Sequence, residues 1–187
     1  MHSSQKNTNI ALFGGAFDPV HKGHLHVAET TLALPHIDKV WFIPAANPPH
    51  KDNCMFTFNQ RITFLKNAIA YNDAFSVYEK DYRNDDKSYT IYLIKELKQL
   101  YPEYEFSFII GADNVTKMQT WYALDELLSE ITFIVVDRDT NDKHLWKDLY
   151  YYHQLVFTPS PTVDISSSEI KKTLLNIVGA ISTSPAT

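Results

Sequence analysis

One segment near the amino terminus restricts the fold more than any other part of the chain. The apolar run 10–13 leads into Gly14 and Gly15, which are followed by Ala-Phe-Asp-Pro-Val-His-Lys-Gly-His at residues 16–24. Neither glycine has a Cβ, so the backbone can turn sharply here and approach a ligand closely. A strand, a glycine turn and a helix in this order are typical of a sheet whose strands alternate with helices.

The same segment carries two histidines where a helix is expected to begin. His21 and His24 are three residues apart, and Gly23 between them leaves room for a ligand against the backbone. The first N–H groups of a helix and its partial positive charge favour bound phosphate, and an imidazole can donate a hydrogen bond to a phosphoryl oxygen. A glycine turn with two surface histidines is the simpler alternative. The preceding strand, the glycine pair and Asp18-Pro19 together favour a nucleotide phosphate site.

Apolar segments with strand and helix periods alternate along the rest of the chain. The expected strands cover residues 10–13, 39–43, 75–78, 106–110, 131–136 and 155–158, the expected helices cover 24–34, 59–71, 88–100 and 123–129, and a terminal helix begins near Ser167. This alternation predicts an α/β fold with a doubly wound, mainly parallel sheet and helices on both faces. Ligands bind such sheets beyond the carboxyl ends of the strands, so we expect the glycine turn and Gly111-Ala112-Asp113 to meet there.

Length and composition restrict the class of protein. We expect 187 residues to form one domain, 1–187, with an ordered core of about 9–178 and flexible polar tails. The net charge of −5 gives no general attraction to nucleic acid or to an anionic membrane, and the single cysteine, Cys54, excludes an internal disulfide. No apolar run is long enough to span a bilayer, and the polar start lacks the apolar core of a signal peptide, so a cytoplasmic protein is expected. No histidine spacing matches a metal site, and the oligomeric state stays open, a homo-oligomer included.

Residues 14–24 resemble the signature of the nucleotidylyltransferase superfamily, Gly-Gly-x-Phe-Asp-Pro-x-His-x-Gly-His, at every defined position. The resemblance implies a Rossmann-like fold and transfer of a nucleotidyl group from a nucleoside triphosphate, with release of pyrophosphate. The residues that it assigns to ATP binding in this segment are Gly14, Gly15, Phe17, His21 and His24. The two histidines would also be catalytic, because they would stabilise charge on the triphosphate.

Three further segments are similar to the bacterial nicotinate mononucleotide adenylyltransferases: Pro-Pro-His-Lys at 48–51, Ser-Tyr-Thr at 88–90 and Gly-x-Asp at 111–113. By themselves they read as a solvated proline-rich loop, a helix cap and a common turn. The resemblance implies that Gly111 and Asp113 contact ATP, that Lys51 is catalytic, and that the indole of Trp121 stacks on the pyridine ring. The substrate-binding residues that it implies are Asn47, His50, Lys51, Ser88, Tyr89, Thr90, Asp113, Trp121 and Arg138.

The last matching segment is Ile165-Ser166-Ser167, which resembles the start of the family pattern Ile-Ser-Ser-Thr-x-Ile-Arg. These three residues are expected to bind ATP phosphates, as is Lys171, which is also a candidate catalytic residue. Lys171 replaces the arginine of the pattern, so the charge is kept but the bidentate fork is lost. Ser168 replaces the threonine of the same pattern, and Tyr92 stands where the family usually has an aspartate.

The resemblance implies the reaction of ATP with nicotinate mononucleotide to give deamido-NAD and pyrophosphate. ATP would be the co-substrate, and Mg²⁺ would bind through its phosphates rather than in a protein metal site. Three alternatives stay open. The acceptor could be nicotinamide mononucleotide or another phosphorylated molecule such as phosphopantetheine, or the protein could be an inactive nucleotide-binding sensor. Nucleic-acid binding has little support in an acidic chain without a basic stripe.

Overall fold

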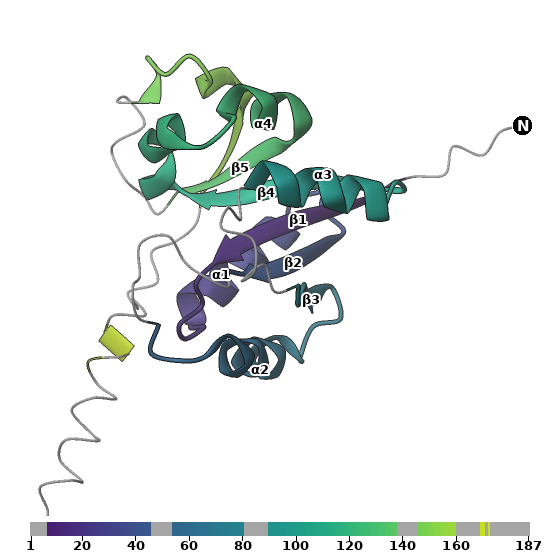
Figure 1. Cartoon of the computed structure of the whole chain (residues 1–187), viewed down its shortest axis with the longest axis vertical. Coiled ribbons are helices and arrows are strands. Elements are labelled where there is room, and N and C mark those ends of the chain that lie inside the picture. Colours follow the sequence, from purple (N-terminus) through teal and green to yellow (C-terminus); the bar gives the residue numbers. More distant parts are fainter. Residues whose placement is uncertain are drawn as a thin grey trace, which may run out of the picture.

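The computed structural model describes residues 7–45, 54–80, 90–137, 146–159, 169–170 and 172. Its strands form one sheet in the order β3-β2-β1-β4-β5-β6, and every neighbouring pair is parallel (Figure 1). The strands are β1 (Thr8–Gly15), β2 (Lys39–Pro44), β3 (Phe75–Val77), β4 (Tyr104–Gly111), β5 (Thr132–Asp137) and β6 (Leu155–Pro159). The predicted parallel α/β sheet is therefore confirmed, and each strand end lies within two residues of its expected position.

The connecting helices also follow the sequence pattern. They are α1 (Lys22–Leu32), α2 (Phe58–Ile69), α3 (Thr90–Leu100) and α4 (Leu124–Glu130), with short 3-10 helices at Ala112–Asn114, Thr116–Thr120 and Tyr152–Gln154. Helix α1 begins two residues earlier than expected, because His21 rather than a later residue is its N-cap. Helix α2 begins with a reciprocal capping box between Thr57 and Gln60. The start predicted for α3 at Ser88 and most of the predicted terminal helix lie outside the described residues.

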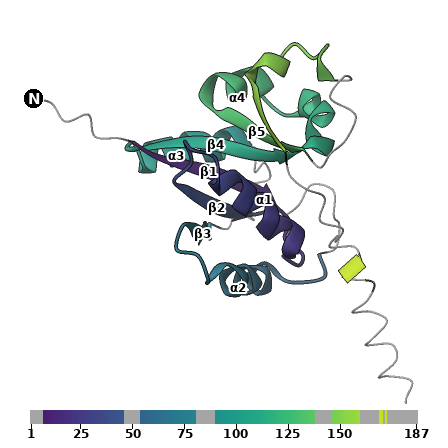
Figure 2. The same ribbon diagram turned by 180° about the vertical axis from the view of Figure 1, so that it is seen from behind.

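Alternating side chains of the strands supply a core on each face of the sheet. Ile10 and Leu12 of β1 pack with α3 and α4, whereas Ala11 and Phe13 pack with α1 and α2. The two views show α3 and α4 on one face and α1 on the other (Figure 2). Burial on both faces explains why β4 and β5 are almost continuously apolar. No helix in the described part of the chain has both the length and the apolar character needed to cross a membrane.

The strand order reverses at β1, and this places the site. From β1 the chain proceeds to β2 and β3 on one side, and it then returns to β4 on the other side. In the parallel register, Phe13 of β1 lies beside Ile109 of β4, so the glycines that end the two strands lie at the same edge of the sheet. A crevice beyond the carboxyl ends of strands at such a reversal is where open α/β sheets bind ligands. The expected meeting of the two turns is confirmed.

Candidate active site

The two histidines lie against each other at the start of α1. Their ring centroids are 3.7 Å apart with an interplanar angle of 32°. The backbone N–H of His21 donates to Nδ1 of His24 over 3.3 Å. A nitrogen that accepts a hydrogen bond carries no proton, so Nε2 is the donor atom of the neutral His24 ring. No described residue accepts from the backbone N–H groups of Lys22 and Gly23, and these groups add donors at the same helix end.

Phe17 packs its buried ring against the ring of His24. Its backbone lies in the left-handed region, with a φ of 44°, and its side chain is buried. The Phe17 ring meets the His24 ring edge to face at a centroid distance of 4.9 Å and the Phe13 ring at 5.4 Å. The left-handed turn thus directs an aromatic ring into the core beneath the histidine, and the resulting contact fixes the orientation of His24.

Both glycines of the turn make room for aromatic rings. A Cβ on Gly14 would lie 2.9 Å from the Phe108 ring, and one on Gly15 would lie 3.0 Å from the Phe17 ring. Neither glycine has a positive φ; among the described residues, that conformation belongs to Phe17 and Ala123. The sharp turn expected from the glycines is therefore located at Phe17, and the glycines provide close packing.

Two buried polar side chains hold the turn against the start of α2. The carboxylate of Asp18 accepts hydrogen bonds from the backbone N–H groups of Met55 and Phe56, each over 2.9 Å. Arg61, with 1% of its surface exposed, donates from Nη1 to the Ala16 carbonyl over 2.6 Å. Neither side chain is among the site residues expected from the sequence. Arg61 occupies a position on the apolar face of α2, and a charged residue there is a signal of a specific buried partner.

Phe108 connects the histidine turn to Trp121. Its ring fills the position that a side chain on Gly14 would occupy. It also meets the half-buried Trp121 ring edge to face at a centroid distance of 6.2 Å. Trp121 also packs edge to face on Phe133 at 6.0 Å. Phe108 and Trp121 thus lie beside the glycine turn on the α3 and α4 face of the sheet, whereas Phe17 and the His24 ring that it contacts lie on the α1 and α2 face.

The turn after β4 presents Asp113 at the same edge. Its exposed carboxylate lies 3.8 Å from Nζ of Lys117 and accepts a 3.4 Å hydrogen bond from Asn114. Within the described part of the chain, no group of three or more histidine, cysteine or acidic side chains is arranged to hold a metal ion. As an exposed carboxylate, Asp113 can accept hydrogen bonds from hydroxyl or amino groups of a ligand.

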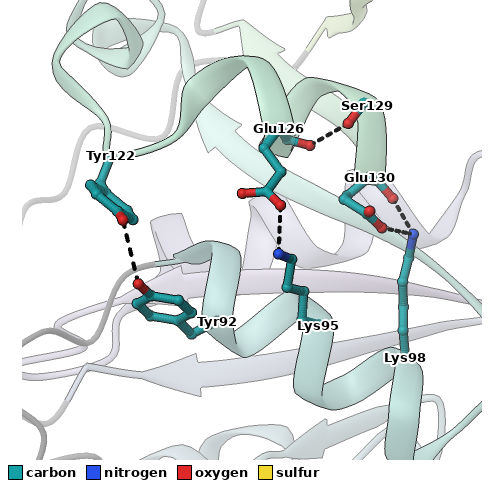
Figure 3. A network of polar contacts seen from close by, with 7 residues as sticks. All are labelled: Tyr92, Lys95, Lys98, Tyr122, Glu126, Ser129 and Glu130. Carbon is teal, nitrogen blue, oxygen red and sulfur yellow. Dashed lines mark hydrogen bonds and ion pairs between the residues drawn. The ribbon is translucent and has the colours of Figure 1, made fainter.

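The first turn of α3 approaches the segment that carries Trp121. Thr90 is the first residue of the helix, and the exposed ring of Tyr92 faces Tyr122 (Figure 3). The structure thus brings Gly14, Gly15, Phe17, His21, His24, Thr90, Gly111, Asp113 and Trp121 to one end of the sheet. The predicted site residues outside the described part of the chain are Asn47, His50, Lys51, Ser88, Tyr89, Arg138, Ile165, Ser166, Ser167 and Lys171.

Residues 139–152 contain none of the motifs named above, yet residues 146–152, which the structure describes, support the site. Trp146 and Tyr151 are buried in the core cluster of α3 and α4. The Tyr151 hydroxyl donates to the Val115 carbonyl over 2.8 Å, and burial raises the pKa of this phenol. Val115 immediately precedes the 3-10 helix that leads to Trp121, so the Tyr151 hydroxyl holds the start of the segment that carries the indole.

Comparisons with known proteins add the family context. Residues 12–173 match the family described as cytidylyltransferase-like. The chain is 39% identical over 166 residues to a Shouchella clausii protein named "Probable nicotinate-nucleotide adenylyltransferase", a match that covers 88% of this chain and 83% of that protein. It is 38% identical over 164 residues to the Bacillus subtilis protein named "Nicotinate-nucleotide adenylyltransferase", covering 87% and 84% of the two chains.

A solved structure shares the fold. The Plasmodium falciparum nicotinic acid mononucleotide adenylyltransferase complexed with NaAD superposes with a TM-score of 0.71 and 25% sequence identity. The match covers 89% of this chain and 84% of that chain. The similarity therefore extends over almost all the elements described above.

Proposed function

The chain belongs to the cytidylyltransferase-like family, and because its relatives at 38–39% identity are named nicotinate-nucleotide adenylyltransferase, we propose that it transfers the adenylyl group of ATP to nicotinate mononucleotide in NAD biosynthesis. The products are deamido-NAD and pyrophosphate. The observation that carries the proposal is the placement of two features at one edge of the sheet: adjacent histidine rings at a helix N-terminus, and a half-buried indole beside Phe108, which packs on Gly14 of the same turn. Such a site offers donors for a triphosphate and a flat face for an aromatic ring.

The reaction requires the protein to position two anions. An oxygen of the acceptor phosphate attacks the α-phosphorus of ATP, a new P–O bond forms, and the bond to the β-phosphate oxygen breaks as pyrophosphate leaves. The attacking oxygen already carries negative charge, so no proton has to be removed from it. Catalysis then depends on alignment and on stabilising the charge that develops on the leaving pyrophosphate.

His24 is the best-defined donor for that charge. Because Nδ1 accepts from the backbone of His21, the Nε2–H is the group that would donate to a triphosphate oxygen. The N–H groups of Lys22 and Gly23 would add donors, and Lys51 and Lys171 would add positive charge. Mg²⁺ would be bound through the ATP phosphates as part of the substrate, where it would supply further positive charge to the triphosphate.

The acceptor would bind between the start of α3 and Trp121. We propose that the pyridine ring stacks on the indole and that the carboxylate lies near residues 88–90, where the helix dipole favours an anion. Asp113 would accept from ribose hydroxyls. Asn47, His50 and Arg138 would complete the acceptor side, and Ile165, Ser166 and Ser167 would contact the ATP phosphates.

The decisive experiment measures pyrophosphate release from ATP and Mg²⁺ with three acceptors in parallel: nicotinate mononucleotide, nicotinamide mononucleotide and phosphopantetheine. We expect turnover with nicotinate mononucleotide and weaker turnover with the nicotinamide form. Equal rates with both pyridine nucleotides would make the enzyme dual-specific. ATP binding without turnover of any acceptor would replace the proposal with the nucleotide-sensor alternative.

A matched pair of histidine variants tests the mechanism. His24→Ala removes the proposed phosphate donor and should lower kcat by about 100-fold, the usual effect of losing one charge-stabilising donor. His36→Ala is the control, because His36 is exposed beyond the other end of α1 and should keep full activity. A His24→Ala enzyme within a few-fold of the wild type in kcat would refute the assigned role.

A further inference from the structure

Three side-chain contacts join α3 to the segment 122–130 (Figure 3). Tyr92 contacts Tyr122, Lys95 pairs with Glu126, and Lys98 bonds both the carboxylate and the carbonyl of Glu130. The three α3 residues are spaced by three, so they lie along one side of the helix. This row of contacts fixes the position of α3 relative to α4 on the same face of the sheet.

The first contact of the row is at the end of α3 nearest the site. Helix α3 connects the parallel strands β3 and β4, so it runs against the strand direction, and its first residue lies at the carboxyl edge of the sheet. Tyr92 is in the first turn of α3, and Tyr122 is the neighbour of Trp121 in the chain. The tyrosine contact therefore spans the two elements between which the pyridine ring would bind.

The geometry of this contact suits a spacer better than a core contact. Each tyrosine is 50% exposed, so neither ring fills the hydrophobic core. The ring centroids are 6.0 Å apart, and the two hydroxyl oxygens are 3.5 Å apart. The Trp121 ring itself is held edge to face by Phe108 and Phe133, so the contact between Tyr92 and Tyr122 acts on the backbone beside Trp121 and not on the indole.

We propose that Tyr92 and Tyr122 act as one positioning unit that sets the width of the acceptor slot between α3 and Trp121. The pair controls the affinity for the pyridine nucleotide, and it leaves the ATP side unchanged. Both tyrosines are positioning residues, because they act through the elements that carry them. This inference rests on the proposed function, since it assigns the device that holds that acceptor.

The test uses the full chain and steady-state pyrophosphate release with each pyridine nucleotide. Tyr92→Ala and Tyr122→Ala should each raise KM for nicotinate mononucleotide by about fivefold, with kcat and KM for ATP within twofold of the wild type. The double variant should resemble the single variants, because both substitutions break the same contact. Tyr92→Phe should keep KM for nicotinate mononucleotide at the wild-type value, because the ring contact with Tyr122 remains. The control is Tyr150→Ala, which truncates a tyrosine that is 64% exposed and bonded to Asp125.

The outcomes distinguish the positioning unit from other roles of the two tyrosines. Additive effects of the two alanine substitutions, or a parallel rise in KM for ATP, would overturn the positioning unit while leaving the proposed function intact. Wild-type protein that turns over neither pyridine nucleotide would overturn the proposed function and this inference together. If Tyr92→Ala fails to fold, Tyr92→Leu keeps apolar bulk on the helix but removes the ring pair, and the same rise in KM is expected.

Discussion

The contact between Gly14 and Phe108 leads to a quantitative prediction about stability. An alanine Cβ at position 14 would lie 2.9 Å from Cζ of Phe108 and 3.6 Å from its Cε1. Carbon atoms in favourable contact are about 3.5–4.0 Å apart, so the ring tip has to move by most of an ångström. Phe108 is held by Trp121 and Phe133, so its ring cannot move without disturbing these neighbours. Overpacking of this kind typically costs 1–3 kcal/mol, and we expect Gly14→Ala to cost about 2 kcal/mol.

A compensating substitution separates lack of space from backbone strain. Gly14 has no positive φ, so alanine is compatible with the backbone, and Phe108→Leu should relieve the contact. We expect the double variant to be more stable than the sum of the single effects by about 1 kcal/mol. The control is Gly111→Ala. Its Cβ would crowd the end of the exposed Asp113 side chain, which can move, and would meet Asn114 at an ordinary contact distance of 3.8 Å, so the variant should stay within about 0.5 kcal/mol of the wild type.

Urea denaturation followed by circular dichroism measures these differences, and thermal melting provides a second reading. For a domain of this size, 2 kcal/mol corresponds to a decrease in Tm of about 4–8 °C. Two results would refute the reasoning: a Gly14→Ala protein as stable as the wild type, or a Phe108→Leu substitution that fails to compensate. Equal losses for the alanine substitutions at 14 and 111 would also contradict it.

Two further predictions concern α2 and its neighbours. Arg61→Met should cost about 2 kcal/mol of stability and lower kcat, because the Ala16 carbonyl loses a charged hydrogen bond. The control is Lys66→Met at an exposed position of the same helix, which should change neither the stability measured by urea denaturation nor the rate of pyrophosphate release. Burial and a hydrogen bond to Glu29 raise the pKa of Tyr71 to about 12 from its usual 10, so its stabilising contribution is complete below pH 10 and is lost as the pH rises to 12. Denaturation measured from pH 8 to 12 should therefore show a steeper decline for the wild type than for Tyr71→Phe, and parallel declines would contradict this assignment.

The fold was predictable because its signals are local. Each strand is a short apolar run, and each helix has a 3.6-residue period with a recognisable end, so even the order of elements follows from the sequence. The adjacency of the glycine turn and Gly111 was also predictable, because parallel strands bring their carboxyl ends to one edge. The glycine turn after β1 and the turn after β4 therefore lie at the same edge of the sheet, as expected.

The supporting contacts were not predictable from local patterns, since each depends on a partner distant in the chain. Arg61 is buried because its guanidinium reaches the Ala16 carbonyl, 45 residues away. The Tyr151 hydroxyl reaches Val115, 36 residues away, from a segment whose sequence carries no periodic signal. The left-handed backbone of Phe17 likewise follows from the aromatic contacts of its ring, although two glycines precede it.

The attachment of the chain on both sides of residues 46–53 has a consequence for how this scaffold can be altered. Ala45 donates to the Gly15 carbonyl, and Met55 and Phe56 donate to Asp18, so both flanks are fastened to the turn that carries the histidines. The stretch 46–53 is thus connected at both ends to segments that are hydrogen-bonded to the histidine turn. Doubling its length would add only about 0.6 kcal/mol of closure entropy. The length of this stretch can therefore be changed while both of its flanks keep their contacts with the turn that carries His21 and His24.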